Sequence, residues 1–312
     1  MMKNMKKGIA LLITLMFIMA ITVSIGIGLS YTKKAQHALL EENFLFQSSM
    51  ILNDVLSLLK NSKELSLIQN DSEGTAFAIF LAQSSFIPFE ASGIQVALEI
   101  TSARSKFNPT TLLSPDKKTI YQARVSALKN YLAKKMVNET YVDILLDGLG
   151  GLKDDLSYNS AVYNTNDTLF RDYIVSAKHL KVYNDFYRDT FYDNALENVE
   201  FDKLFYYSGD VNASNTYIID LNYATAEVWA MMLGVDEVRA EQLAFNGGTY
   251  SENNKADLSS DESRALESFK TTYKPQLYLD VKVEIIQDRS SAKIAFEYDI
   301  KKARGYNFSY EI

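Results

Sequence analysis

The sequence contains no cysteine and only two histidines, His37 and His179, among its 312 residues. Without cysteine the chain cannot form disulfides, thiolate nucleophiles, cysteine-ligated zinc sites or iron–sulfur clusters. Two isolated histidines also leave no basis for a multi-histidine metal site or a histidine-based catalytic relay. The phosphate-loop pattern GxxxxGK[ST] and the HExxH and GxSxG motifs are missing as well. We therefore expect a protein that is not an enzyme and needs no cofactor.

Positive charge is also in short supply, because the formal net charge at pH 7 is −7. An acidic surface argues against nucleic acid as the main partner, since binding to phosphates requires a basic one. Hydrophobic residues make up 47% of the chain, which is enough for a substantial core and for two modest domains.

The N-terminal part is dominated by an uncharged, apolar run of 23 residues from Ile9 to Tyr31. As a helix rising about 1.5 Å per residue it would be about 34 Å long, enough to cross a hydrocarbon core of about 30 Å. Lys3, Lys6 and Lys7 precede the run and favour a cytoplasmic N-terminus. Secretory signals have a shorter apolar core and a small-x-small cleavage site, which is missing here. The sequence predicts one membrane span over residues 9–31.

The apolar run begins immediately after the basic stretch that ends in Gly8. This arrangement resembles the class III leader of type IV pilins and type II secretion pseudopilins. In that superfamily a prepilin peptidase of the inner membrane cuts after the glycine and methylates the new N-terminus. The resemblance implies that residues 1–8 are removed, that Ile9 becomes the N-methylated first residue, and that the formal charge changes from −7 to −10. A plain single-span anchor, in which Gly8 has no such role, is the alternative.

Mature position five would be Ile13, where most pilins carry a glutamate that neutralises the N-terminal ammonium of a neighbouring subunit. A buried charge without its partner is costly, so a subunit packed beneath another one needs this glutamate. A subunit with no neighbour above it does not. Within the superfamily, the absence of the glutamate is typical of the large tip pseudopilin, general secretion pathway protein K. The resemblance implies a minor pseudopilin at the tip of a pseudopilus, assembled with other minor pseudopilins and with its C-terminal body in the bacterial periplasm.

Residues 35–60 carry an apolar stripe at three-, four- and seven-residue spacing, which predicts an amphipathic helix. We favour packing of this stripe against the protein's own sheet, with a coiled-coil seam as the alternative. The stripe consists of Leu40, Phe44, Ile51, Val55 and Leu59.

Strand-like alternation occurs on both sides of a long helical stretch. We expect a strand at 94–101, a hairpin of 277–288 and 292–302, and a last strand in 306–312. Helices are predicted over 119–149 and near 166–175, 197–206, 222–233, 236–246 and 259–271.

The fold class is therefore α+β, with an all-α domain inserted between strands. The resemblance implies a pilin-like fold in which the long N-terminal helix packs on an antiparallel sheet. We expect the first part of this pilin-like domain over 32–108, the insert over 109–274 and the remaining strands over 275–312.

Two internal segments extend the resemblance to the protein K family. KFNPTTLL at 106–113 resembles the segment that leads into that family's α-domain, and residues 217–244 resemble a second segment, in which Asn222 and Thr225 are retained. The second segment also contains Leu233-Gly234-Val235, which could begin a helix-hairpin-helix module for binding the DNA backbone. Asp236 stands where that module needs its second glycine, and its carboxylate would repel phosphate.

Carboxylates are the only abundant functional side chains, and Asp147, Asp154 and Asp155 lie close together in the sequence. Oxygen ligands at such spacing could hold Ca²⁺, although the EF-hand pattern is absent. These residues resemble an acidic segment of the protein K family, whose members bind calcium. A solvated acidic loop is the alternative.

The run at 183–207 is rich in tyrosine and phenylalanine and is expected to be either a helix pair in the core of the insert or an interaction surface. Four functions remain: a tip subunit of a type II secretion pseudopilus, a minor pilin at a type IV pilus tip, a single-span periplasmic binding protein, and a DNA-binding protein of a competence system. The first is favoured.

Overall fold

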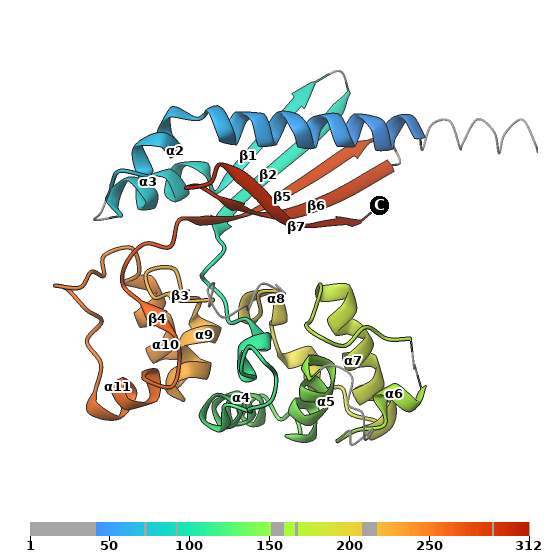
Figure 1. Ribbon diagram of the computed structural model, residues 1–312, viewed down its shortest axis with the longest axis vertical. Helices are drawn as coiled ribbons and strands as arrows, with labels where there is room; N and C mark the ends of the chain where they lie inside the picture. The colour runs from blue at the N-terminus through green and yellow to red at the C-terminus, as the bar shows by residue number, and fades with distance from the viewer. Residues whose placement is uncertain are drawn as a thin grey trace, which may run out of the picture.

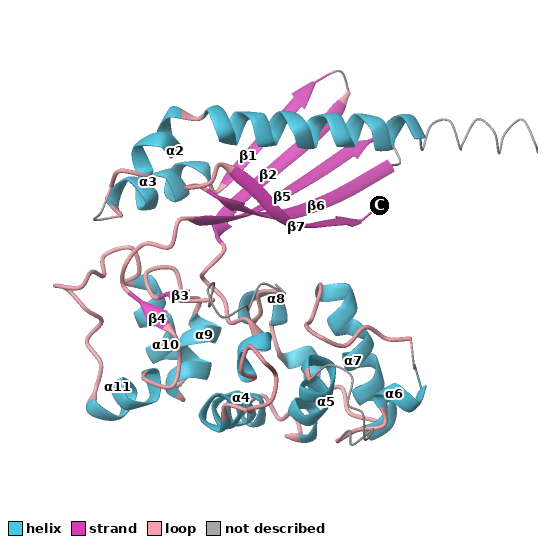
Figure 2. Ribbon diagram, viewed as in Figure 1, coloured by secondary structure: helices cyan, strands magenta, loops and turns pink. Residues whose placement is uncertain are grey.

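The computed structural model describes residues 42–71, 74–91, 93–150, 159–165, 168–207, 217–288 and 290–311. In this part of the chain a long helix lies on one face of a five-stranded sheet, and a second, mainly helical domain lies beyond the opposite face (Figure 1). Figure 2 separates the two parts by colour, with the large sheet in the upper body and nearly all the short helices in the lower one. This is the α+β class with an inserted helical domain that the sequence predicts.

The large sheet is antiparallel throughout, with strand order β1-β2-β5-β6-β7. β2 and β5 are direct neighbours although about 175 residues separate them in the chain, because the insert leaves the sheet after Ser102 and returns at Tyr278. The alternation in the sequence correctly predicts four of these five strands. The strands are β1 Phe86–Ala91, β2 Ile94–Ser102, β5 Tyr278–Gln287, β6 Ser290–Asp299 and β7 Arg304–Glu311.

β1 is an edge strand that the sequence analysis missed, because it contains Pro88 and does not alternate. The backbone N–H of Ile100 donates to the carbonyl of Ser85, 3.2 Å away, so the odd-numbered residues of β1 bond to β2. Pro88 therefore directs its backbone outward, where a missing N–H breaks no ladder hydrogen bond. It also leaves the free edge with fewer donors for a strand from another chain.

Residues 42–61 are helical and pack their apolar stripe against the sheet. Phe44, Val55 and Leu59 are buried there against the apolar faces of β2, β5 and β6, as the first of the two sequence-based alternatives predicts. Leu40, the first residue of the predicted stripe, lies outside the described residues. Two short helices, α2 Lys63–Ile68 and α3 Thr75–Ser84, continue the layer over the end of the sheet.

The insert has a core of its own, which runs from Ala103 to Phe269 and is separate from the core beneath the long helix. The two-residue strands β3 Ile219–Asp220 and β4 Thr271–Thr272 pair in parallel, and β4 lies shortly before the chain returns from the insert to the large sheet. Its helical segments are η1 Pro109–Leu112, α4 Gln122–Lys134, α5 Thr140–Leu149, α6 Val162–Thr165, α7 Ala177–Phe191, η2 Ala195–Asn198, α8 Phe201–Leu204, α9 Ala226–Leu233, α10 Glu237–Phe245 and α11 Ser260–Leu266.

The single helix predicted over 119–149 is wrong, because the structure has two helices, α4 and α5, with a break between them. Met136 has φ +66°, a left-handed conformation that ends α4. The N–H of Asn138, which no longer lies in a helix, donates to the hydroxyl of Tyr187 on α7, 3.0 Å away. The side chain of Asn138 in turn accepts from the N–H of Thr140 at the start of α5. A tertiary contact therefore overrides a continuous helical pattern.

The predicted helix near 166–175 is also wrong, since residues 168–175 are not helical. The aromatic run that follows is largely buried, because Tyr183 and Tyr187 on α7 are fully enclosed in the core of the insert. Tyr183 reaches so close to Gly148 that a Cβ there would lie 2.7 Å from the tyrosine ring. Tyr192, at the end of α7, is 93% exposed and marks where this run meets solvent.

Candidate assembly interface and interdomain junction

The residues predicted to carry processing and tip placement, Gly8, Ile9 and Ile13, lie outside the described residues, as does the predicted span over 9–31. Among the helices that the structure does describe, none is both long and apolar enough to cross a membrane. The leader, the span and the N-methylation of Ile9 therefore stay predictions.

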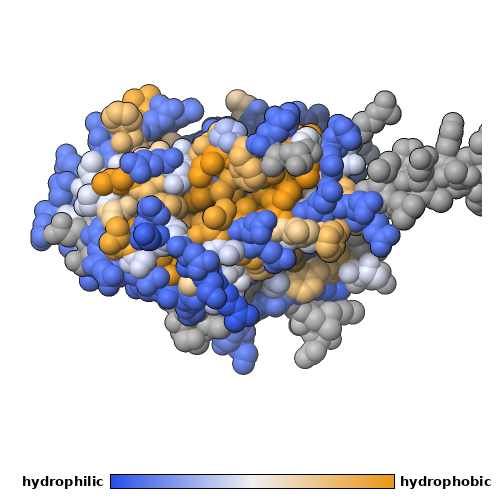
Figure 3. Space-filling model, turned by 90° about the horizontal axis from the view of Figure 1, so that it is seen from above, coloured by the Kyte–Doolittle hydropathy of each residue, from blue (hydrophilic) through white to orange (hydrophobic). Residues whose placement is uncertain are grey.

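The described part of the long helix carries apolar side chains on its solvent face as well as on its sheet face. Phe46 is 66% exposed and Met50 is 52% exposed, one turn apart on the side opposite the core stripe. Seen from the helix side, apolar residues gather across the middle of this face of the molecule (Figure 3). A large apolar side chain on the solvent face of a helix lowers the free energy only when something covers it.

The apolar face of the sheet likewise extends beyond the helix that covers it. Ile87 and Phe89 on β1 pair with Leu98 and Val96, whose side chains are buried under the helix, so all four lie on the same face. Ile87 and Phe89 are nevertheless 39% and 43% exposed. We refer to Phe46, Met50, Ile87 and Phe89 as the helix-side apolar face, which is a candidate surface for packing against another subunit.

A buried ion pair joins the insert to the sheet at the point where the chain leaves β2. The guanidinium of Arg104 lies 2.6 Å from the carboxylate of Glu297 on β6, and both side chains are almost fully enclosed. The other carboxylate oxygen of Glu297 accepts from the hydroxyl of Tyr206, also at 2.6 Å. The Arg104 guanidinium stacks 4.0 Å from the ring centre of Tyr278 and 4.8 Å from that of Tyr217. We call these five residues the junction cluster.

The electrostatics of the junction cluster favour the charged pair once it has formed. Burial works to lower the pKa of Arg104, but the charge and hydrogen bond of Glu297 outweigh it and hold this pKa above its usual value. Tyr206 stays a neutral hydrogen-bond donor, because burial and the adjacent carboxylate raise its pKa well above the ordinary range. The junction cluster therefore connects the two domains through one almost fully enclosed ion pair.

The insert also contacts the layer of short helices. The ring of Tyr223, in the turn after β3, packs edge-on against Phe77 of α3 with centroids 5.4 Å apart. Pro275, in the segment that returns to the sheet, lies so close to Gly74 that a Cβ there would come within 2.7 Å of the proline ring. Gly74 has φ +82°, so glycine is required at this position for its conformation and for the space it leaves.

Asp220 lies buried between the chain's entry into the insert and its exit. Its backbone N–H donates to the carbonyl of Arg104, and its carboxylate accepts from the N–H groups of Asn222 and Gln276. Burial raises the pKa of Asp220 to about 7, against the opposing effect of these hydrogen bonds. Asn222, retained in the family-like segment, bonds through its side chain to the backbones of Tyr273 and Tyr250.

Of the three predicted calcium ligands, only Asp147 lies in the described part of the chain, while Asp154 and Asp155 lie outside it. The carboxylate of Asp147 is fully buried and accepts four hydrogen bonds, from the backbone and side chains of Asn159 and Ser160. Within the described residues, no group of three or more histidine, cysteine or acidic side chains is arranged to hold a metal ion. Asp147 thus holds Asn159 and Ser160 against the end of α5, and the calcium site stays a prediction.

The turn between α9 and α10 has the start of a helix-hairpin-helix, with Gly234 at φ +69°. Asp236 caps α10, its side chain accepting from the N–H of Arg239 at the helix end where a phosphate would bind. The amine of Lys134 donates to the carbonyls of Gly234 and Val235. This turn is therefore a capped connection between two helices.

A comparison with protein-family models finds no match, and neither does a comparison with curated proteins. Among solved structures, a chain of the GspK-GspI-GspJ complex of the type 2 secretion system from enterotoxigenic Escherichia coli is similar, with a TM-score of 0.52. The match covers 87% of this chain and 97% of that chain, at 13% sequence identity. The fold is pseudopilin-like. This confirms the pilin-like α+β architecture expected from the sequence, with the long helix on an antiparallel sheet and an inserted helical domain.

The junction cluster could not be predicted from the sequence. Arg104 follows a strand and Glu297 occupies a polar position in an alternating one, so each resembles a solvent-facing residue. Both become buried only because the insert folds back over that face of the sheet. The one available signal was the position of Arg104 next to the family-like segment 106–113, at the predicted edge of the insert.

Proposed function

We propose that this chain is a non-catalytic minor pseudopilin that assembles with other minor pseudopilins at the tip of a type II secretion pseudopilus. The observation that carries the proposal is the architecture: a helix-on-sheet body with a helical domain inserted between two neighbouring strands, similar over nearly its whole length to a chain from a type 2 secretion complex. The leader-like sequence at Gly8 and Ile9 supports it independently.

In the proposed mechanism, prepilin peptidase cleaves after Gly8 and methylates Ile9, and the apolar helix then passes from the inner membrane into the fibre. Ile13 lacks the charge needed to pair with the N-terminal ammonium of a neighbouring subunit. This suits a subunit that has no other subunit above it. The helix-side apolar face offers a surface for neighbouring subunits, and its Phe46 and Met50 lie on the helix over residues 42–61.

A minor pilin at the tip of a type IV pilus is the second candidate, because the absence of a glutamate at Ile13 fits a pilus tip equally well. The inserted domain favours secretion, since the similar solved chain comes from a secretion complex.

The first experiment is to determine the N-terminal mass of the membrane-extracted protein with and without prepilin peptidase. Cleavage before an N-methylated Ile9 that depends on the peptidase supports the proposal. An intact Met1, or cleavage elsewhere, contradicts it and favours a plain membrane anchor. The variant Gly8→Ala, which should block cleavage, is the matched control.

The assembly surface can be tested separately by replacing Phe46 and Met50 together with serine. Both side chains are more than half exposed, so the fold should be kept while co-purification of other pseudopilins falls. Exposed Val238 on α10, replaced by serine, is the control, because it lies on the insert and far in sequence from the helix.

A further inference from the structure

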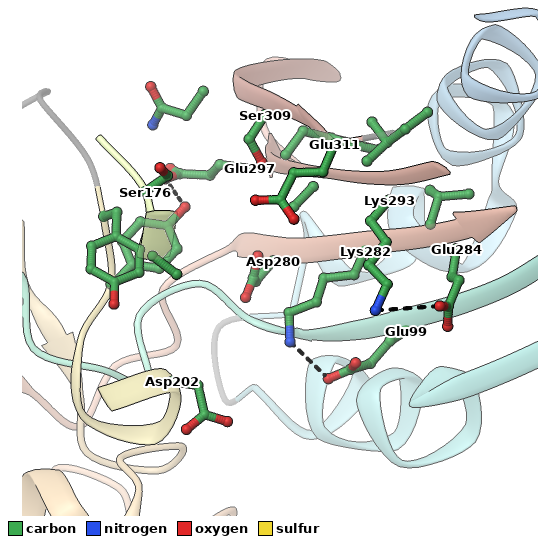
Figure 4. Close-up of a pocket in the computed structure, with 18 of the residues that line it drawn as sticks. Glu99, Ser176, Asp202, Asp280, Lys282, Glu284, Lys293, Glu297, Ser309 and Glu311 are labelled. Carbon is green, nitrogen blue, oxygen red and sulfur yellow. Dashed lines mark hydrogen bonds and ion pairs between the residues drawn. The ribbon is translucent and has the colours of Figure 1, made fainter. Parts of the chain in front are cut away.

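An open groove of about 410 Å³ lies between the insert and the polar face of the sheet, on the side opposite the long helix (Figure 4). Residues from all five strands of the sheet line one wall. Residues 175–177, 202 and 205–207 of the insert line the other wall. Its volume lies within the range of about 300 to 1,000 Å³ that is typical of ligand-binding clefts.

The groove is long because it crosses the whole sheet. Neighbouring strands are about 4.8 Å apart, so the distance from β1 to β7 is about 19 Å. An extended chain advances about 3.3 Å per residue, so this length matches about six residues of extended polypeptide. A compact ligand would occupy only part of such a groove.

The groove carries an excess of negative charge. Six carboxylates and three lysines line it, and each lysine forms an ion pair with a carboxylate of the groove itself. These pairs are Lys282 with Glu99 at 3.2 Å, Lys293 with Glu284 at 3.4 Å, and Lys106 with Asp280 at 3.9 Å.

Of the three remaining carboxylates, Glu297 belongs to the junction cluster, while Asp202 and Glu311 form no ion pair with any described residue. Figure 4 shows Asp202 on the insert side of the groove and Glu311 on the strand side. A cleft with unpaired charge of one sign on both walls attracts ligands of the opposite sign.

Exposed apolar side chains from both walls complete the lining of the groove. Phe86 of β1 is 61% exposed and Val175, just before α7, is 48% exposed. Ala97 and Ala295 contribute small side chains on the sheet wall, which leave the space open. The groove thus combines an apolar surface with two free carboxylates.

We propose that this groove binds an extended segment of a partner polypeptide in which an aromatic or aliphatic residue is flanked by lysine or arginine. The apolar residue packs against one of the exposed apolar side chains of the lining, Phe86 or Val175, and the cations lie beside Asp202 and Glu311. The junction cluster, which includes Tyr206 of the groove lining, joins the insert to the sheet beside the groove. This site goes beyond the proposed role in assembly and does not depend on processing at Gly8.

The proposal is tested with the full chain in detergent micelles and two synthetic probes. One is Lys-Val-Bpa-Val-Lys, where Bpa is the photoreactive benzoylphenylalanine, and the other is Glu-Val-Bpa-Val-Glu. After illumination, the crosslinked residues are located by mass spectrometry. We expect the lysine probe to crosslink within the groove, at residues near Phe86 or Val175, and at least fivefold more efficiently than the glutamate probe. Equal crosslinking by both probes, or crosslinks only outside the groove, would overturn the proposal.

Variants separate a specific groove from a general attraction to an acidic protein. The double variant Asp202→Asn, Glu311→Gln should weaken binding of the lysine probe about fivefold at low salt, because it removes two exposed ion pairs, each of which contributes modestly to affinity. The control is Glu252→Gln, Asp261→Asn, which removes the same charge from exposed sites outside the groove and should leave binding unchanged.

A third variant fills the groove itself. Ala295→Arg places a long cation on the sheet wall and should reduce binding tenfold or more, with an unchanged circular-dichroism spectrum. Equal affinity of the Asp202/Glu311 variant and its control, or full binding to Ala295→Arg, would show that the groove is not the site.

Discussion

Replacing Glu297 with alanine leaves the Arg104 guanidinium enclosed without a counter-charge. The side chains of Arg104 and Glu297 are only 11% and 6% exposed, so solvent screens the pair weakly. Breaking a buried ion pair by removing one partner destabilises a protein by about 3 to 5 kcal/mol. For a protein of this size about 1 kcal/mol corresponds to about 2 to 4 °C, so the melting temperature should fall by about 10 °C.

The double variant Arg104→Met, Glu297→Met distinguishes a charge effect from simple damage to packing. Removing both charges abolishes the desolvation penalty, and apolar side chains of similar length fill the space, so most of the lost stability should return. Trp229 is the only tryptophan of the chain and is buried in the core of the insert, so its fluorescence reports unfolding of that domain. Far-ultraviolet circular dichroism reports both domains.

We expect Glu297→Ala to lower the melting temperature measured by tryptophan fluorescence and by circular dichroism, and the double variant to restore both values. If Arg104→Met and Glu297→Met, each made singly, cost less than about 1 kcal/mol, the pair is not the buried, unscreened interaction described above. If the double variant is as unstable as the sum of the single ones, the charges are not coupled and the reasoning fails.

Three further predictions concern titration, metal binding and assembly. The pKa of Asp220 is about 7 in the folded chain against an ordinary 3.8, so stability falls as the pH rises from about 4 to about 7. Asp220→Asn should therefore reduce the difference in melting temperature between pH 5 and pH 7, and an unchanged difference would contradict the assignment. If Asp147, Asp154 and Asp155 hold Ca²⁺, calorimetry on the full chain should detect heat of binding and the melting temperature should rise with added Ca²⁺, whereas no response in either measurement excludes the site. Ile13→Glu should impair assembly of a tip subunit, measured by co-purification of the other pseudopilins, and improved assembly would argue against placement at the tip.

The sequence predicts those parts of the fold that depend on local periodicity. Alternation in residues 277–302 identifies the β5–β6 hairpin, and the stripe of Phe44, Val55 and Leu59 identifies the face of the helix that packs on the sheet. β1 could not be predicted in this way, because Pro88 and two exposed faces give it no alternating pattern. Its place at the edge of the sheet, which makes both features acceptable, is a property of the whole fold.

The break between α4 and α5 shows the same limit. Residues 119–149 form one helical pattern, and nothing nearby in the sequence indicates that Tyr187, about 50 residues later, accepts a hydrogen bond from the backbone of Asn138. The junction cluster and the groove arise in a similar way, because both need the insert to lie against the polar face of β6. A charged residue at a polar position of an alternating strand is expected to face solvent. Only the position of the insert makes Glu297 a buried ion-pair partner of Arg104.

The ends of the insert lie side by side, since the backbone N–H of Ala103 donates to the carbonyl of Tyr278 and the two flanking strands pair directly with each other. The body of helix and sheet therefore does not need the insert for its register. A tight turn joining β2 to β5 could replace the whole domain, which would uncover Phe77 and return Glu297 to solvent. Closing a loop this long costs only slightly more entropy than closing one half its length. Domains of very different size could thus be exchanged at this point in evolution, or by design, without rebuilding the body of helix and sheet.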